Sequence, residues 1–183
     1  HLWDAVYLQT NNIEIPDEAY QSGGLLYDGG KFFSPIGTES VPFSGGYDGN
    51  EFVIDNLKID RSSADFAGLF GYTDGAYIEN IGILNATIKG ADFVGSLIGY
   101  LDKTGGATGD TLQTSYVKQS LVEGNNNVGG LVGYANESAV IRDAYSQAVV
   151  KGNESVGGLV GYSHHRSGTA DLPEISNTYA VGT

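Results

Sequence analysis

The chain has 183 residues, among them 28 glycines, 12 tyrosines and 7 phenylalanines, and it contains neither cysteine nor methionine. Its 22 acidic and 9 basic residues give a formal net charge of -13 at pH 7, which repels nucleic-acid phosphates and anionic membranes. Disulfides and thiolate metal sites are excluded, and no run of about 18 apolar residues is present to form a transmembrane helix. We therefore expect neither nucleic-acid binding nor membrane insertion.

The two ends of the sequence suggest a piece of a longer protein. The opening residues, His-Leu-Trp-Asp, lack the basic and apolar segments of a signal peptide. The sequence stops at Thr183 inside a repeat. We expect a monomeric fragment of a longer exported precursor.

Residues 1–60 precede the regular part of the sequence and are predicted to form an N-terminal cap and a leader coil. They contain PIG at 35–37, YDGN at 47–50 and IDNL at 54–57. Proline, glycine, Asn and Asp favour turns between short strands, and terminal repeats must shield the open end of a stack. Residues 61–183 are predicted to be the repeats, continuous with the cap in one structural domain.

A seven-residue motif then occurs four times. The copies read FAGLFGY at 66–72, VGSLIGY at 94–100, VGGLVGY at 128–134 and VGGLVGY at 156–162. The central leucines, 28, 34 and 28 residues apart, are Leu69, Leu97, Leu131 and Leu159, and the final tyrosines are Tyr72, Tyr100, Tyr134 and Tyr162. A fixed period of this length is the mark of stacked repeat units.

A second element follows each motif, an aliphatic residue with an Asn-like residue two positions later. It occurs as Ile78/Asn80, Leu112/Thr114, Ile141/Asp143 and Ile175/Asn177, and earlier as Ile54/Asn56. Frequent glycine with many Val, Ile and Tyr favours short strands over helices. One coil of such strands cannot bury its apolar face alone, so coils must stack about 4.8 Å apart. The predicted fold is all-β: a β-solenoid with an N-terminal cap, in which the leucines, the tyrosines and the Asn-like residues each form a ladder.

Strand alternation leaves one point open. In the third motif it puts Val128, Val132 and Tyr134 on one face of a strand and Leu131 on the other. Either a bulge at the glycine pair redirects the chain, or a neighbouring loop covers the leucine.

The connections that follow the second and fourth motifs are longer than the others and should form loops on one side of the stack. Residues 163–173 include His164, His165 and Arg166, which are candidate ligand-binding residues, although a solvated loop is the simpler interpretation. Loops of this kind carry much of the individuality of repeat proteins.

Calcium is the one cofactor considered, and no other is expected. The sequence GGATGD at 105–110 is similar to a calcium-binding glycine and aspartate repeat but occurs once, whereas such repeats work in arrays. Asp102 and Asp110 are the candidate ligands.

No catalytic constellation is recognisable, so we predict no catalytic residue and no enzymatic activity. The histidines, His1, His164 and His165, do not form the H-E-x-x-H pattern of zinc peptidases. Ser115 and Lys118 match S-x-x-K without the partner motifs of the enzymes that use it. The motif tyrosines could offer a sugar-stacking face, but a packing ladder is the favoured interpretation.

The motif resembles the GLUG repeat family, named for its glycine-leucine-glycine core, which corresponds to GLFG at 68–71 and GLVG at 130–133. Residues 33–59 look like the leader that precedes the first such repeat, so the resemblance covers about residues 33–183. Ser96 departs from the glycine pair of the third and fourth copies. The resemblance implies extracellular bacterial proteins, namely surface adhesins and immunoglobulin A peptidases that carry such repeats outside their catalytic part.

Two functions follow as expectations. The first is a non-catalytic module of a bacterial surface adhesin, extracellular or on the cell surface, which acts as a rigid stalk or as an adhesive surface. Its partner would be a host-cell surface protein or glycan, or none if the module is a spacer. The alternative is an accessory domain of a secreted peptidase whose active site lies outside this sequence.

Overall fold

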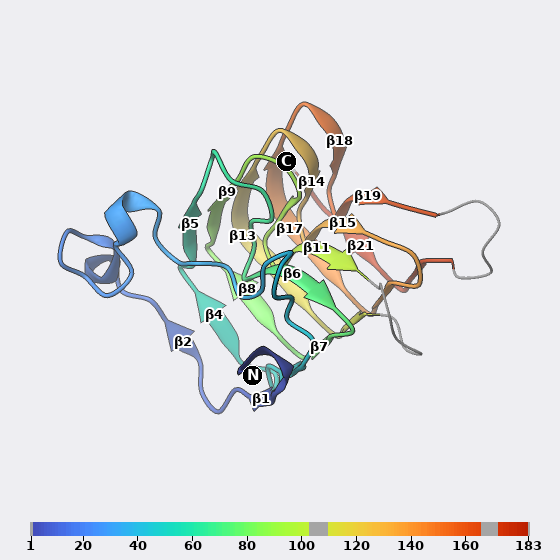
Figure 1. Ribbon diagram of the computed structural model, residues 1–183, viewed down its shortest axis with the longest axis horizontal. Coiled ribbons are helices and arrows are strands. Elements are labelled where there is room, and N and C mark those ends of the chain that lie inside the picture. Colours follow the sequence, from blue (N-terminus) through green and yellow to red (C-terminus); the bar gives the residue numbers. More distant parts are fainter. Residues whose placement is uncertain (1, 103–109, 166–171, 183) are drawn as a thin grey trace.

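The computed structural model describes residues 2–102, 110–165 and 172–182, and it shows the predicted β-solenoid (Figure 1). All paired strands run parallel and connect residues one coil apart. The helical segments in the described part are three short 3-10 turns: η1 (Leu2–Asp4), η2 (Asp17–Tyr20) and η3 (Asp28–Gly30). None of the described helices has the length and apolar character needed to cross a membrane.

Four sheets form the walls of the solenoid. The six-stranded sheet contains β1 (Val6–Leu8), β3 (Gly46–Asp48), β7 (Tyr77–Glu79), β12 (Thr111–Gln113), β16 (Val140–Arg142) and β20 (Glu174–Ser176). The eight-stranded sheet contains β2 (Ile13–Glu14), β4 (Val53–Asp55), β5 (Lys58–Asp60), β8 (Gly82–Leu84), β9 (Thr87–Lys89), β13 (Tyr116–Glu123), β17 (Tyr145–Lys151) and β21 (Tyr179–Ala180). The four-stranded sheet contains β6 (Phe70–Asp74), β11 (Ile98–Asp102), β15 (Val132–Ala135) and β19 (Val160–Ser163), and the three-stranded sheet β10 (Val94–Gly95), β14 (Asn126–Gly129) and β18 (Glu154–Gly157).

Each repeat motif turns a corner between two walls. Val128 lies in β14 of the three-stranded sheet and Val132 in β15 of the four-stranded sheet, with Gly130 and Leu131 at the bend between them. The side chains of Val128, Leu131 and Val132 are all 0% exposed. The motif is therefore two short strands joined at a corner, and all three side chains point inward. Neither the bulge nor the covering loop considered from strand alternation is needed.

The Asn-like residues also lie at a corner, between the six-stranded and eight-stranded sheets. Their φ angles are between 49° and 55°, in the left-handed region that Asn and Asp tolerate, for Asn80, Thr114, Asp143 and Asn177. Ile54 does not belong to this set, because it pairs with Ile83 in the eight-stranded sheet. The early Ile54/Asn56 element was therefore assigned to the wrong corner.

Inside the walls the side chains form ladders along the stack. Leu69, Leu97 and Leu131 are buried, and Leu159 packs against the same core from the last turn. Three other ladders become smaller along the chain. They are Phe70, Ile98, Val132 and Val160; Ile54, Ile83, Val117, Ser146 and Ala180; and Ile59, Ile88, Val122 and Val150.

This graded core brings opposite walls together toward the C-terminal end. A Cβ atom added to Gly130 would lie 2.2 Å from the Ser146 hydroxyl oxygen. The wall at the motif corner and the eight-stranded sheet are thus in direct contact at this level. The narrower cross-section accommodates the small Ser146 at the position where the preceding coil holds the larger Val117.

Residues 2–60 supply strands to the same sheets and also cover one end of the stack. Phe43 bridges to Thr73 beside β6, and its ring lies 4.9 Å from the ring of Phe70. Residues 16–32 form a side excursion (Figure 1, blue). It inserts the buried Tyr20, whose hydroxyl donates to the Asn56 carbonyl at 2.8 Å. The leader therefore both forms coils and packs on the first wall of the repeats.

Candidate functional site

The motif tyrosines stand in one stacked row on the outer side of the four-stranded sheet. Ring centroids are 4.7 Å apart for Tyr72 and Tyr100, 4.6 Å for Tyr100 and Tyr134, and 5.3 Å for Tyr134 and Tyr162. The interplanar angles are 4°, 11° and 20°. The spacing follows directly from the parallel register of β6, β11, β15 and β19, which places the tyrosines opposite one another.

Two phenylalanines that the sequence analysis did not select complete this aromatic row. Phe66 and Phe93 stack on each other at 5.2 Å and 12°, and they meet the tyrosine rings edge to face. Both have positive φ, 64° and 58°. The sequence does contain the repeat of phenylalanine, but alignment on the leucines paired Phe66 with Val94. The structure pairs Ala67 with Val94, so that Phe66 corresponds to Phe93.

This geometry bears on sugar binding. A sugar stacks on the free face of an aromatic ring, and in this row each ring covers the face of the next. Tyr162, at the end of the row, is 43% exposed. Burial raises the pKa of Tyr72 and Tyr100, and the neighbouring Asp102 raises that of Tyr72 further, so the phenols stay protonated. The arrangement is that of a packing ladder.

The two calcium candidates hold hydrogen bonds within the protein. The Tyr72 hydroxyl donates to Oδ2 of Asp102 at 2.6 Å, and Nδ2 of Asn136 donates to Oδ1 at 2.5 Å. Oδ1 of Asp110 accepts from the backbone N–H of Ala76 at 2.6 Å, and Oδ2 accepts from the Thr73 hydroxyl. Both carboxyl groups are almost fully buried.

The structure does not test the calcium prediction. The first five residues of GGATGD, 105–109, lie outside the described part of the chain. Over residues 2–102, 110–165 and 172–182, no cluster of three or more His, Asp or Glu side chains is placed to hold a metal. Calcium binding by Asp102 and Asp110 stays a prediction.

Asp110 should make stability depend on pH. Burial raises the pKa of Asp110 from the ordinary 3.8 to about 7, although the hydrogen bonds from Thr73 and Ala76 act to lower it. Between these pH values the folded protein binds more protons than the unfolded chain. Its unfolding free energy should therefore fall as pH rises from about 4 to about 7, by up to about 1.4 kcal/mol per pH unit.

Asp110→Asn should remove this slope. An asparagine can still accept from Ala76 and can donate to Thr73, so the fold should persist. Denaturant unfolding at several pH values should show the parent losing stability relative to Asp110→Asn as pH rises. Glu14→Gln, at an exposed position, controls for the lost charge, and identical slopes in all three proteins would contradict the assignment.

One of the two loop histidines, His164, lies beside the end of the tyrosine row. The His164 ring is 6.2 Å from the Tyr134 ring and 6.3 Å from the Tyr162 ring. His165 is exposed, and Arg166 lies outside the described residues. The structure thus brings His164, but not His165, to the aromatic row, and their role in ligand binding stays a prediction.

A second tyrosine row lies on the eight-stranded sheet and was also missed. Ring centroids are 5.1 Å apart for Tyr116 and Tyr145 and 4.9 Å for Tyr145 and Tyr179. The ammonium of Lys118 lies over the first two rings. These tyrosines each follow the aliphatic residue of the second element by four positions, a regularity that could have identified them. Lys118 is accordingly an aromatic contact, and Ser115 is a buried hydroxyl that donates to the Gln113 carbonyl at 2.7 Å.

No protein-family model matches the chain, so GLUG membership stays a prediction. The chain is 36% identical over 122 residues to halomucin from Haloquadratum walsbyi, a match that spans 64% of this chain and 1% of halomucin. Among solved structures it is similar to a candidate immunoglobulin A1 protease from Bacteroides ovatus, with a TM-score of 0.52 and 20% identity over 87% of this chain and 55% of that chain. The second likeness is one of fold.

Proposed function

We propose that this chain is a non-catalytic extracellular module, which serves a bacterial surface protein of the adhesin type as a rigid stalk or an adhesive surface. The observation that carries the proposal is the stack itself. Four walls of parallel strands surround ladders of apolar side chains, and each coil is held by its neighbours, which gives an extended scaffold with an inert interior.

The comparisons support an extracellular setting. The match to halomucin, 36% identity over 122 positions, favours an extracellular module. The chain matches 1% of halomucin, as expected for one module among many in a long protein. The net charge of -13 favours solubility of an exposed chain.

An accessory domain of a secreted peptidase is the second candidate. The likeness in fold to the Bacteroides protein favours it, since that protein is described as a candidate immunoglobulin A1 protease. The coding sequence around this chain separates the two candidates. A zinc-peptidase motif in the same reading frame would favour the accessory domain, and a long series of further repeats would favour the adhesin.

The proposal predicts binding without turnover. The purified chain should bind saturably to a glycan array or to cultured host cells as an adhesive module, or bind neither as a spacer. In both cases it should release no reducing ends from polysaccharides and no fragments from immunoglobulin A. Assays with calcium and then with a chelator test the calcium prediction at the same time. Catalytic release of either product would overturn the proposal.

A further inference from the structure

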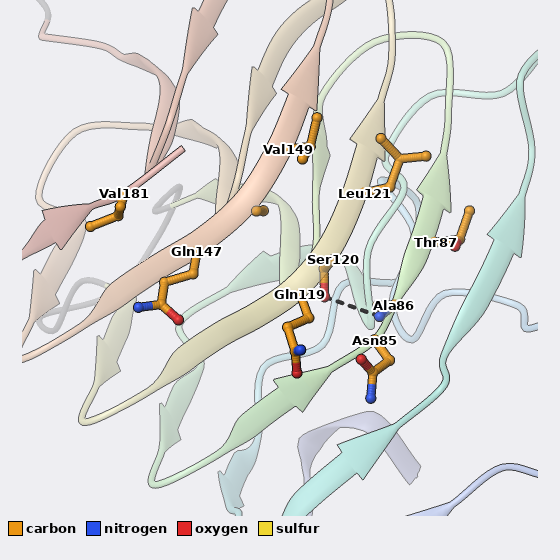
Figure 2. Close-up of a pocket in the computed structure, with 10 residues that line it drawn as sticks. Asn85, Ala86, Thr87, Gln119, Ser120, Leu121, Gln147, Val149 and Val181 are labelled. Atoms are coloured by element: carbon orange, nitrogen blue, oxygen red, sulfur yellow. Dashed lines mark hydrogen bonds between the residues drawn. The ribbon is translucent and has the colours of Figure 1, made fainter. Parts of the chain in front are cut away.

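A groove crosses the outer surface of the eight-stranded sheet where β8 gives way to β9 and where β13 and β17 bend (Figure 2). Its volume is about 640 Å³. Ten residues from three successive coils and the last segment line it: Asn85, Ala86, Thr87, Gln119, Ser120, Leu121, Gln147, Ala148, Val149 and Val181. The groove therefore runs along the stack, across the strands.

One side of the groove is a row of amides. Asn85 and Gln119 occupy equivalent positions in successive coils, and Gln147 lies opposite Lys118 in the next coil. All three side chains are exposed. The side-chain amides of Gln119 and Gln147 make no hydrogen bond with the described part of the chain, whereas that of Asn85 donates to Asp55 at 2.8 Å. The row thus offers the free donors and acceptors of two glutamines on neighbouring coils.

The backbone at Gln119 is left-handed, with a φ of 52°, as it is at the equivalent Asn85, with a φ of 51°. A register shift between Lys118 and Ser120 makes Gln119 an extra residue relative to the neighbouring strand β17. A left-handed conformation is unfavourable for glutamine, which lacks the short side chain that helps Asn and Asp. Strained positions persist where the surrounding structure holds them and often mark function.

The opposite side is mainly apolar, and the floor is made of small residues. Leu121, Val149 and Thr87, which adds one hydroxyl group, face the amides across the groove (Figure 2). The floor hydroxyl, Ser120, already has partners, since it accepts from the Ala86 N–H at 3.0 Å and donates to the Lys118 carbonyl at 2.9 Å. A ligand would therefore meet amides on one side and, on the other, hydrocarbon with the Thr87 hydroxyl.

The lining is uncharged although the chain carries a net charge of -13. None of the ten lining residues is acidic or basic. The surrounding negative field repels an anionic ligand, and no cationic side chain in the groove compensates for it. A neutral ligand with many hydroxyl groups fits amides beside an apolar wall.

A polypeptide fits less well. Peptides that bind to sheets usually add a strand at a free edge, but the groove crosses the middle of the sheet. Strand β13 pairs there with β8 and β9 on one side and with β17 on the other. Apart from the extra residue Gln119, the strand residues of β13 are thus already paired, and the side-chain amides are what remains for a ligand.

We propose that this groove binds a neutral polysaccharide chain that lies along the stack and receives hydrogen bonds from one amide per coil. The proposal rests on the adhesive form of the function proposed above. Because the groove is open and has no aromatic platform, single sites should be weak, and affinity would come from many modules on one polymer.

Affinity electrophoresis of the 183-residue chain tests the site. Native gels would contain barley β-glucan, galactomannan or soluble starch as neutral polymers, and polygalacturonate as an acidic one. The double variant Gln119→Gly/Gln147→Ala removes both free amides, and glycine relaxes the left-handed position, so its melting temperature should equal or exceed that of the parent. The matched control is Gln21→Ala, which changes an exposed glutamine in the N-terminal excursion of residues 16–32, outside the groove.

We expect at least one neutral polymer to retard the parent and Gln21→Ala, with a dissociation constant about tenfold higher for the double variant, as the loss of two hydrogen bonds implies. Equal retardation of parent and double variant would overturn the proposal that the groove is the binding site. It would leave the proposal of an adhesive module standing. Retardation by polygalacturonate alone, or capture by peptides alone, would overturn the ligand class. If no polymer retards the parent, the groove proposal fails and the stalk remains, whereas depolymerisation would overturn the non-catalytic function itself.

Discussion

Leu131→Asp should unfold the solenoid around the third motif and cost about 5 kcal/mol or more of unfolding free energy. Leu131 is 0% exposed and lies at a corner where its backbone bonds to the coils on both sides. The substitution leaves a cavity and an unpaired carboxylate in an apolar core, and both effects are costly. The loss is comparable with the whole stability of many domains, about 5–15 kcal/mol.

The unfolding of Leu131→Asp should also lose cooperativity. Each coil is stabilised mainly by its two neighbours, so a broken coil divides the stack into parts that melt separately. Circular dichroism should show a melting transition with more than one step. Hydrogen exchange should show loss of protection first in β14 and β15. Leu25→Asp makes the same chemical change at a side chain that is 93% exposed, and it should melt with the parent; equal melting of Leu131→Asp and the parent would exclude the leucine ladder.

Gly133→Ala should have the second-largest effect, a loss of about 3 kcal/mol of unfolding free energy. A Cβ atom at this position would lie 2.5 Å from the Val94 nitrogen and 2.6 Å from the Gly99 oxygen. Both atoms belong to the backbone of the preceding coil, so a side-chain rotation cannot relieve the clash. One methyl group should therefore push two coils apart and break the parallel pairing of β11 with β15.

Chemical denaturation of Gly133→Ala measures the cost. Gly182→Ala is the control, since the nearest atom to a Cβ there is the Ala148 oxygen at an ordinary 3.6 Å. The variant should unfold at lower denaturant concentration than both the parent and this control. A midpoint unchanged from the parent would mean that the coils are not packed as closely at this glycine as the structure has them.

The repeat made the fold predictable, because recurrence of the same residues at a fixed interval requires equivalent positions in a stack. The leucine corner was not predictable from alternation, since Gly130 lets the chain change walls where a strand would continue. Ile54 was placed at the wrong corner for a related reason. An aliphatic residue followed two positions later by Asn occurs both before β8, as Ile78/Asn80, and at its end, as Ile83/Asn85. Only pairing with Ile83 distinguishes the two.

The candidate site was harder to predict than the fold. The tyrosine row was visible because its residue type is constant, but the use of its ring faces for packing depends on three-dimensional register. The amide row escaped notice because the equivalent Asn85 and Gln119 differ in residue type, and because Gln147 lies opposite Lys118 and not opposite Gln119. A search for a chemical property at equivalent positions, in place of a residue type, would have found Asn85 and Gln119 but not Gln147.

The graded core gives the repeats an order that their shared motif conceals. Similar repeats in a gene are prone to duplication and deletion when misaligned copies recombine. A product that placed the coil of Ser146 beside the coil of Phe70 would set small core side chains against a cross-section shaped for large ones and leave voids. Copy number within this stretch is thus under a packing constraint, and growth of the protein by recombination would be tolerated more readily as whole blocks of coils than as single repeats.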